Sequence, residues 1–139
     1  MSANILILDD EESILFSFHR FLVAVGYRVT VADSYQKALR KMDEDTFDLI
    51  LADIILGDGC GMDILQEVKR RMLPTRVVIM TAYPTKETKE TSFRLNAMEY
   101  LTKPLRQERL LAIVKDVLGH LLGAVDVVKT GLPTASILP

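Results

Sequence analysis

Short apolar runs alternate with longer segments of helical period along most of the chain, and this alternation constrains the fold more than any other feature. Such a pattern is typical of successive βαβ units, which build a parallel sheet. The third run is apolar on both sides, as expected for a central strand that is covered on both faces. The sequence therefore predicts an α/β domain with five strands, at Ile5–Leu8, Arg28–Val31, Asp48–Ala52, Arg76–Met80 and Glu99–Leu101.

The segments between these runs carry apolar residues at the spacing of one helical face. In the first segment Phe18 and Leu22 recur at that spacing, and Gly26 ends the helix. Asp33 or Ser34 is a suitable cap for the second helix. The predicted helices are Glu12–Val25, a segment after Ser34, a segment that ends at Met72, Lys86–Leu95 and Gln107–Leu122.

The length of 139 residues suits a single domain. We expect this domain to cover residues 1–123, and we interpret residues 124–139 as a tail or the beginning of a linker. The content of 49% hydrophobic and 26% charged residues is ordinary for a globular fold with its own core. The formal net charge of -2 provides no general attraction to nucleic acid or to an anionic membrane, so we expect no direct binding to either.

Several features favour a cytoplasmic location. Cys60 is the only cysteine, so no internal disulfide is possible and nothing indicates an oxidising compartment. The chain reaches the acidic residues 9–12 too early for a signal peptide, and no apolar stretch is long enough to span a bilayer. We therefore expect a cytoplasmic protein without a membrane anchor.

Polar residues follow four of the predicted strands at the point where each strand ends. Asp9 and Asp10 follow the first strand, Asp53 the third, Thr81 the fourth and Lys103 the fifth. The carboxyl ends of neighbouring parallel strands open on one edge of a sheet, where open α/β sheets bind ligands. We therefore expect these five side chains to converge on one site.

The predicted site combines three carboxylates with one ammonium and one hydroxyl. Carboxylates this close repel one another and require a cation, and hard oxygen ligands without thiolate or imidazole favour Mg²⁺. A bound Mg²⁺ would leave Asp53 ionised and able to attack phosphorus, giving an aspartyl phosphate. Lys103 would then pair with one phosphoryl oxygen, and the Thr81 hydroxyl would bond another.

Four motifs in this order and spacing resemble the receiver domain of two-component response regulators. The resemblance covers about residues 4–122 and implies a flavodoxin-like (βα)5 fold, a doubly wound five-stranded parallel sheet with strand order 2-1-3-4-5. The expected function is phosphorylation-dependent signalling rather than enzymatic turnover. The motifs are Ile5–Glu11 (ILILDDE), Asp48–Asp53 (DLILAD), Met80–Ala82 (MTA) and Tyr100–Pro104 (YLTKP).

The resemblance also implies a role for each site residue. Asp53 is the expected phosphoacceptor, and Asp9 and Asp10 belong to the metal-binding acidic pocket together with Asp53 and the backbone carbonyl of Ile55. Pro104 corresponds to the proline after the family's lysine, which is often joined to it by a cis bond. Lys103 and Thr81 keep the roles argued above.

Thr81 and Tyr100 are the residues expected to switch the domain between two packings. In this family the threonine follows the phosphoryl group inward, and the aromatic residue turns into the vacated space, which remodels the surface from the fourth helix to the last. Tyr100 is equally compatible with a plain core aromatic, and both interpretations stay open. The polar fourth helix has few apolar anchors besides Phe93 and Leu95, so we expect it to be the loosest helix.

The expected partners are a histidine kinase or phosphotransfer protein upstream, and an output domain or partner protein downstream. A homodimer that forms on phosphorylation is a further candidate. Two alternatives remain from the sequence. One is a pseudo-receiver that binds partners without phosphorylation, and the other is a Mg²⁺-dependent phosphatase with Asp53 as nucleophile, which usually needs a general acid where this chain has Ile55.

The chain departs from the family pattern beside the expected site. Gly57 stands where a proline is frequent, which predicts a more mobile loop, and Asn96 stands where a glycine is frequent, a position at which asparagine tolerates a left-handed backbone.

Ile55 and Tyr83 occupy positions that influence how fast the family's phosphoryl group is lost. Both side chains are bulky and partly apolar, so we predict that they restrict water and that the phosphorylated domain is long-lived. The measurement is loss of the phosphoryl group over time from the isolated domain. A half-life of seconds would contradict the prediction.

Overall fold

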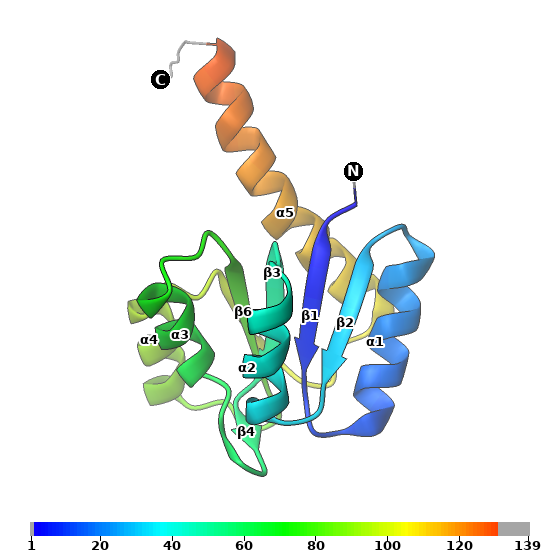
Figure 1. Cartoon of the computed structure of the whole chain (residues 1–139), viewed down its shortest axis with the longest axis vertical. Helices are drawn as coiled ribbons and strands as arrows, with labels where there is room; N and C mark the ends of the chain where they lie inside the picture. The colour runs from blue at the N-terminus through cyan, green and yellow to red at the C-terminus, as the bar shows by residue number, and fades with distance from the viewer. Residues whose placement is uncertain (1, 131–139) are drawn as a thin grey trace. The chain divides into compact units, whose positions relative to one another are not determined.

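Five parallel strands form the central sheet of this protein. The computed structural model describes the backbone of residues 2–130 and the side chains of residues 2–119. The strands lie in the order β2-β1-β3-β6-β7, which is the predicted order 2-1-3-4-5, so the predicted fold class is confirmed (Figure 1). They are β1 (Asn4–Leu8), β2 (Arg28–Ala32), β3 (Leu49–Asp53), β6 (Arg76–Thr81) and β7 (Glu99–Thr102).

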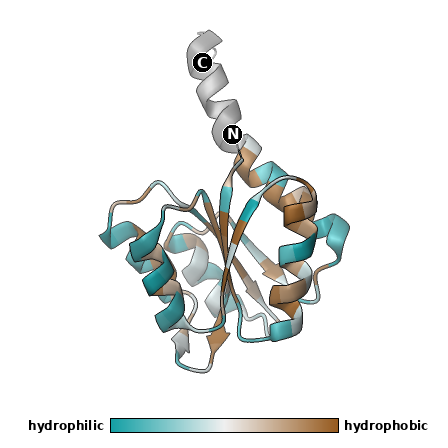
Figure 2. Cartoon of the chain, turned by 45° about the vertical axis from the view of Figure 1, so that its right-hand side comes forward, coloured by the Kyte–Doolittle hydropathy of each residue, from teal (hydrophilic) through white to brown (hydrophobic). Residues whose placement is uncertain are grey.

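The two strands at the centre, β1 and β3, are buried along their whole length. Successive side chains of a strand point to opposite faces of the sheet. Leu6, Leu8 and Ile50 therefore share a face, and they belong to one core cluster with Ala38 and Ile64 from two helices. In Figure 2 the strands carry the hydrophobic colour between helices that also show hydrophilic surface. Burial on both faces explains why these strands are continuous apolar runs.

Four helices connect the strands of residues 2–107. They begin close to the predicted positions, and Ser34 proves to be the cap of the second helix, since its hydroxyl accepts a hydrogen bond from the Lys37 N–H. Gly26, with φ of 101°, follows the first helix as predicted. Figure 1 shows α2 in front of the sheet and α1 at its right. The bounds are α1 (Glu12–Ala24), α2 (Tyr35–Glu44), α3 (Asp63–Arg70) and α4 (Lys86–Arg94).

The fourth helix differs from the prediction in its anchors. Phe93 is 43% exposed and does not anchor α4, whereas Ser92 is fully buried and its hydroxyl donates to the Lys89 carbonyl. Asn96, just after the helix, has φ of 73°, so its predicted left-handed backbone is confirmed. That α4 is the loosest helix stays a prediction.

A short antiparallel hairpin follows β3 where the sequence predicts a loop. Its two strands, β4 (Ile55–Leu56) and β5 (Gly59–Cys60), flank the turn Gly57-Asp58. The Gly61 N–H closes the hairpin by donating to the Ile54 carbonyl at 2.8 Å. Strands of two residues are too short to show any periodicity, so the hairpin left no signal in the sequence pattern.

The last helix, α5 (Gln107–Thr130), begins where it was predicted but runs beyond the predicted end at Leu122. A glycine inside a helix costs only about 1 kcal/mol, which a long helix tolerates, so Gly123 does not end it. Leu110, Val114 and Val117 are buried, as their spacing predicts.

The chain divides into two compact units after Gln107. The predicted boundary at residue 123 falls within α5 and stays a prediction, and residues 131–139 lie outside the described part.

Within residues 2–130, no helix combines the length and the apolar content that crossing a bilayer requires.

Candidate functional site

The ends of β1 and β3 bring three carboxylates together. The two strands pair in register from Ile5 with Leu49 to Leu8 with Ala52, so Asp9 and Asp53 follow paired residues on adjacent strands. Asp10 comes directly after Asp9. Carboxylate oxygens of Asp9, Asp10 and Asp53 all lie within 4.8 Å of one another. The structure thus places these residues at one edge of the sheet, where the sequence pattern puts them.

Lys103, the residue directly after β7 (Glu99–Thr102), also contacts this cluster. Its side chain is 6% exposed, and its Nζ lies 2.7 Å from Asp9 Oδ2, 3.1 Å from Asp53 Oδ2 and 3.1 Å from Glu11 Oε1. Burial alone would lower the pKa of Lys103, but the three carboxylates outweigh it and raise the pKa above its ordinary value. Lys103 is therefore a permanent cation at this site.

Asp9 is the most buried carboxylate of the cluster. Its Oδ1 accepts a hydrogen bond from the Glu11 N–H at 2.8 Å, whereas Oδ2 is buried without a hydrogen bond of good geometry despite the close ammonium. Burial raises the pKa of Asp9, and Lys103 and the Glu11 N–H counteract this only in part. Among the described side chains, the Lys103 ammonium contacts three carboxylates and Asp10 adds a fourth beside Asp9 and Asp53, so negative charge is in excess.

The residues present fit a hard divalent cation. Three oxygen ligands lie close enough to share one ion, and the buried Asp9 Oδ2 has only the Lys103 ammonium beside it. Neither thiolate nor imidazole belongs to this group of ligands. The excess negative charge would be reduced by such an ion.

Thr81 is the last residue of β6 and is buried beside this edge. Met80, the residue before Thr81, pairs with Asp53 where β6 runs beside β3. The Thr81 hydroxyl accepts a hydrogen bond from the Tyr83 N–H at 3.0 Å, which leaves its own proton available for donation. The Thr81 carbonyl accepts the Lys103 N–H at 2.8 Å, so the hydroxyl and the lysine are held on adjacent strands.

Tyr100 is half-buried in β7 and packs against the core cluster. Its hydroxyl lies 2.6 Å from Thr88 Oγ1 and accepts the Thr85 N–H at 3.2 Å. Thr85 is the N-cap of α4. Tyr100 is therefore both a packing residue and a polar link to the start of α4, and the sequence pattern gave no signal for Thr88 as its partner.

The family model of the response regulator receiver domain matches residues 5–115. This chain belongs to the response regulator receiver family.

Curated and structural relatives agree with that assignment. The transcriptional regulatory protein ZraR of Klebsiella oxytoca is 35% identical over 117 residues, which are 84% of this chain and 26% of ZraR. The chain thus spans about a quarter of the length of this curated relative. A CheY-like receiver domain from Methanospirillum hungatei JF-1 superposes with a TM-score of 0.85 at 29% identity, covering 89% of this chain and 99% of that one.

The beryllofluoride-activated NtrC4 receiver domain dimer is a further structural relative. It has a TM-score of 0.79 and 29% identity, with 84% of this chain and 97% of that chain covered. The domain described here is therefore a signalling domain of two-component systems, and its carboxylate cluster is compatible with Mg²⁺.

Pro104, Tyr83 and Ile55 are the remaining residues that the sequence analysis singles out. The Lys103–Pro104 peptide bond is cis. The side chains of Ile55 and Tyr83 are 55% and 73% exposed, so both stand at the protein surface. The Ile55 carbonyl belongs to the β4–β5 hairpin that directly follows Asp53.

The sequence pattern did not predict that Glu11 and Gly61 belong to the receiver site. Glu11 is a third carboxylate on Lys103, and its place in the acidic run after the first strand was the available signal. Gly61 lies against the backbone of the phosphoacceptor candidate, because a Cβ there would overlap the Asp53 carbonyl oxygen. A glycine within a turn-rich segment is a known sign of such close approach.

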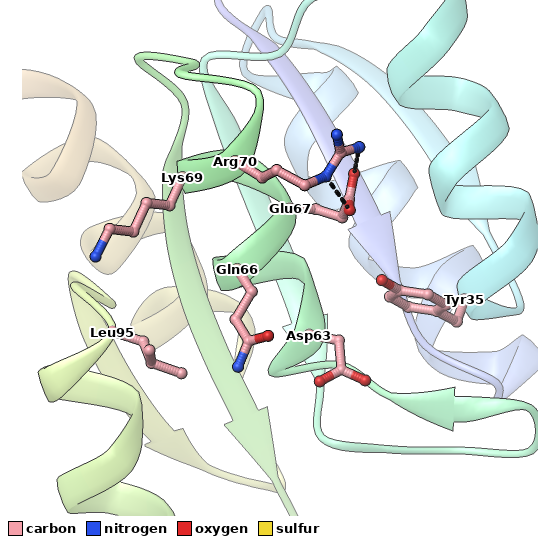
Figure 3. A pocket seen from close by; sticks show the side chains of 7 residues that line it. All are labelled: Tyr35, Asp63, Gln66, Glu67, Lys69, Arg70 and Leu95. Atoms are coloured by element: carbon pink, nitrogen blue, oxygen red, sulfur yellow. Dashed lines mark hydrogen bonds and ion pairs between the residues drawn. The ribbon is translucent and has the colours of Figure 1, made fainter.

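The receiver also has a surface groove away from the carboxylate cluster. It has a volume of about 690 Å³ and lies between α2, α3 and the end of α4, as Figure 3 shows. Glu67 at its wall is bound by Arg70 and Arg71, which lower the pKa of Glu67 to about 2. Tyr35 stands at another wall, and its pKa is raised by partial burial and then by Asp63 and Glu67. None of the cluster carboxylates lines this groove.

Gly61→Ala tests how tightly the backbone after Asp53 is packed. We expect the receiver to lose about 2 to 3 kcal/mol of unfolding free energy, because the new methyl group must displace the Asp53 carbonyl. The measurement is urea denaturation. Gly57→Ala is the matched control, since a Cβ at Gly57 meets nothing within 4 Å. Equal stability of the two variants would show that the Asp53 backbone yields freely.

Proposed function

We propose that this receiver accepts a phosphoryl group on Asp53 from a histidine kinase or a phosphotransfer protein, and that Mg²⁺ is required. The observation that carries the proposal is the buried Lys103 ammonium, whose Nζ lies 3.1 Å from Asp53 Oδ2 and 2.7 Å from Asp9 Oδ2. This arrangement places a cation beside the Asp53 carboxylate, at the edge of the sheet where a phosphoryl oxygen would arrive.

We assign a separate role to each residue of the site. Asp9 and Asp10, with Asp53 and the Ile55 carbonyl, would hold the metal ion, which would neutralise charge on the phosphoryl oxygens. A carboxylate oxygen of Asp53 attacks phosphorus, a new P–O bond forms, and the bond from phosphorus to the donor's nitrogen breaks. Lys103 pairs with one phosphoryl oxygen, and the Thr81 hydroxyl donates a hydrogen bond to another. Pro104 follows Lys103 through the cis bond.

The signal would leave the site through Thr81 and Tyr100. Because the Thr81 hydroxyl accepts the Tyr83 N–H, movement of Thr81 toward the phosphoryl group would pull on the segment between β6 and α4. Inward rotation of Tyr100 would break its bonds to Thr85 and Thr88 at the start of α4. Phosphorylation would therefore shift the population toward a packing with a remodelled surface at α4 and β7.

The downstream partner is part of the same proposal. We infer that the receiver controls an output domain or a separate partner protein, since ZraR is named as a transcriptional regulatory protein. A homodimer that forms on phosphorylation is the other mode, in analogy to the activated NtrC4 dimer. The formal net charge of -2 argues against nucleic acid as a direct ligand of this chain. We place the protein in the cytoplasm and assign it signalling rather than substrate turnover.

The proposal is tested by the intact mass of the protein after incubation with acetyl phosphate, with and without Mg²⁺. Wild type should gain one phosphoryl group only with Mg²⁺, because the excess carboxylate charge otherwise repels the donor. Asp53→Asn should gain none. Asp63→Asn is the matched control, since this exposed aspartate lies on α3 outside the cluster and its loss should leave the adduct intact.

Two outcomes would contradict the proposal. An adduct of equal yield on Asp53→Asn would place the phosphoryl group elsewhere. Absence of any adduct in wild type would favour a phosphorylation-independent receiver, or a phosphatase if the donor is consumed.

A further inference from the structure

The β4–β5 hairpin is bound to a helix by one exposed side chain at its tip. Asp58 Oδ1 accepts the Tyr35 N–H at 2.8 Å, and Asp58 Oδ2 accepts the Gln36 N–H at 3.0 Å. Tyr35 and Gln36 are the first two residues of α2. Their N–H groups have no acceptor within the helix, so a carboxylate from elsewhere in the chain caps them.

These bonds are favourable despite their exposure to water. Both are charge-assisted, and the carboxylate lies at the positive end of the helix dipole. The hydrogen bond from Gln36, followed by that from Tyr35, lowers the pKa of Asp58 below its ordinary value. Asp58 therefore stays ionised, with both oxygens engaged, at any pH near neutrality.

A second contact fixes the same tip. The Tyr35 side chain lies against Gly59, where a Cβ would come within 3.5 Å of the Tyr35 Cβ and ring. At the base of the hairpin, the Gly61 N–H donates to Ile54, and Gly61 lies against the Asp53 carbonyl. The segment from Asp53 to Gly61 is thus fixed at its base by the sheet and at its tip by α2.

We propose that Asp58 is a positioning residue for the metal site, because it ties the hairpin that carries the Ile55 carbonyl to the start of α2. This inference rests on the proposed function, in which that carbonyl is a metal ligand. Asp58 itself touches neither metal nor phosphoryl group. It keeps the carbonyl in place before the ion arrives, so that binding does not have to order the hairpin. The Gly57 turn, which lacks the rigidity of proline, is compensated by this anchor.

The test is the Mg²⁺ dissociation constant of the whole chain, measured by titration with backbone amide NMR. Asp58→Ala should raise the dissociation constant about three- to tenfold, less than is usual for groups that bond a metal ligand directly. Asp58→Asn retains one acceptor oxygen and should give an intermediate value, and it serves if Asp58→Ala does not fold.

Ser34→Ala is the matched control. It removes a cap from the same helix, the bond from the Lys37 N–H, but leaves the hairpin contacts in place. It should lower thermal stability in the manner of an Asp58 variant while leaving Mg²⁺ affinity unchanged. That split separates positioning of the hairpin from stabilisation of α2.

The outcomes are distinct. Unchanged Mg²⁺ affinity in both Asp58 variants would overturn the positioning role, and so would an equal loss in Ser34→Ala. Failure of wild type to bind Mg²⁺ at all would instead overturn the proposed function, and the inference with it.

Discussion

The buried ammonium of Lys103 is the interaction on which the rest of the site depends. It contacts carboxylates that follow β1 and end β3, although β7, the strand that precedes Lys103, is separated from β3 by β6. Neighbouring strands are about 4.8 Å apart, so only a long side chain reaches across that distance. The parallel register of β1 and β3 determines which side chains the ammonium contacts, because Asp9 and Asp53 follow the paired residues Leu8 and Ala52. Fold and site are therefore linked through one side chain, and the flanking hydroxyl of Thr81 is placed by the strand that Lys103 spans.

Gathering like charges costs the fold stability unless a cation balances them. Three carboxylates contact one ammonium, Asp10 lies beside two of them, and Asp9 is fully buried. A site that was selected for stability alone would not collect like charges in this way. In the proposed function, this negative charge would attract a divalent cation, and the cation would allow a negatively charged phosphoryl group to approach. The backbone after Asp53 is closely packed, since Gly61 lies against the Asp53 carbonyl and Asp58 accepts two hydrogen bonds from the start of α2.

The sequence pattern was sufficient for the sheet and for the residues at its edge, since buried strands read as apolar runs and their polar ends follow directly. It was insufficient for very short strands and for contacts between residues that are far apart in the sequence. The hairpin at Ile55–Cys60 is too short for a period, and the Asp58 cap joins residues 22 and 23 positions apart. Thr88 meets Tyr100 only because α4 and β7 are neighbours. The predicted end of α5 at Leu122 was wrong. Gly123 resembles a stop signal, yet a helix can continue through a glycine.

The most direct test of the account is the free energy of unfolding as a function of Mg²⁺, for wild type and Asp9→Asn at constant ionic strength. Burial raises the pKa of Asp9, so near neutral pH its charged form destabilises the metal-free fold. Asp9→Asn should therefore be more stable than wild type without Mg²⁺, by about 1 kcal/mol, and should gain little when Mg²⁺ is added. Wild type should gain stability steadily as Mg²⁺ rises above its dissociation constant. A wild-type stability that does not respond to Mg²⁺, or a metal-free Asp9→Asn less stable than wild type, would contradict the claim that the carboxylate cluster is a strained metal site.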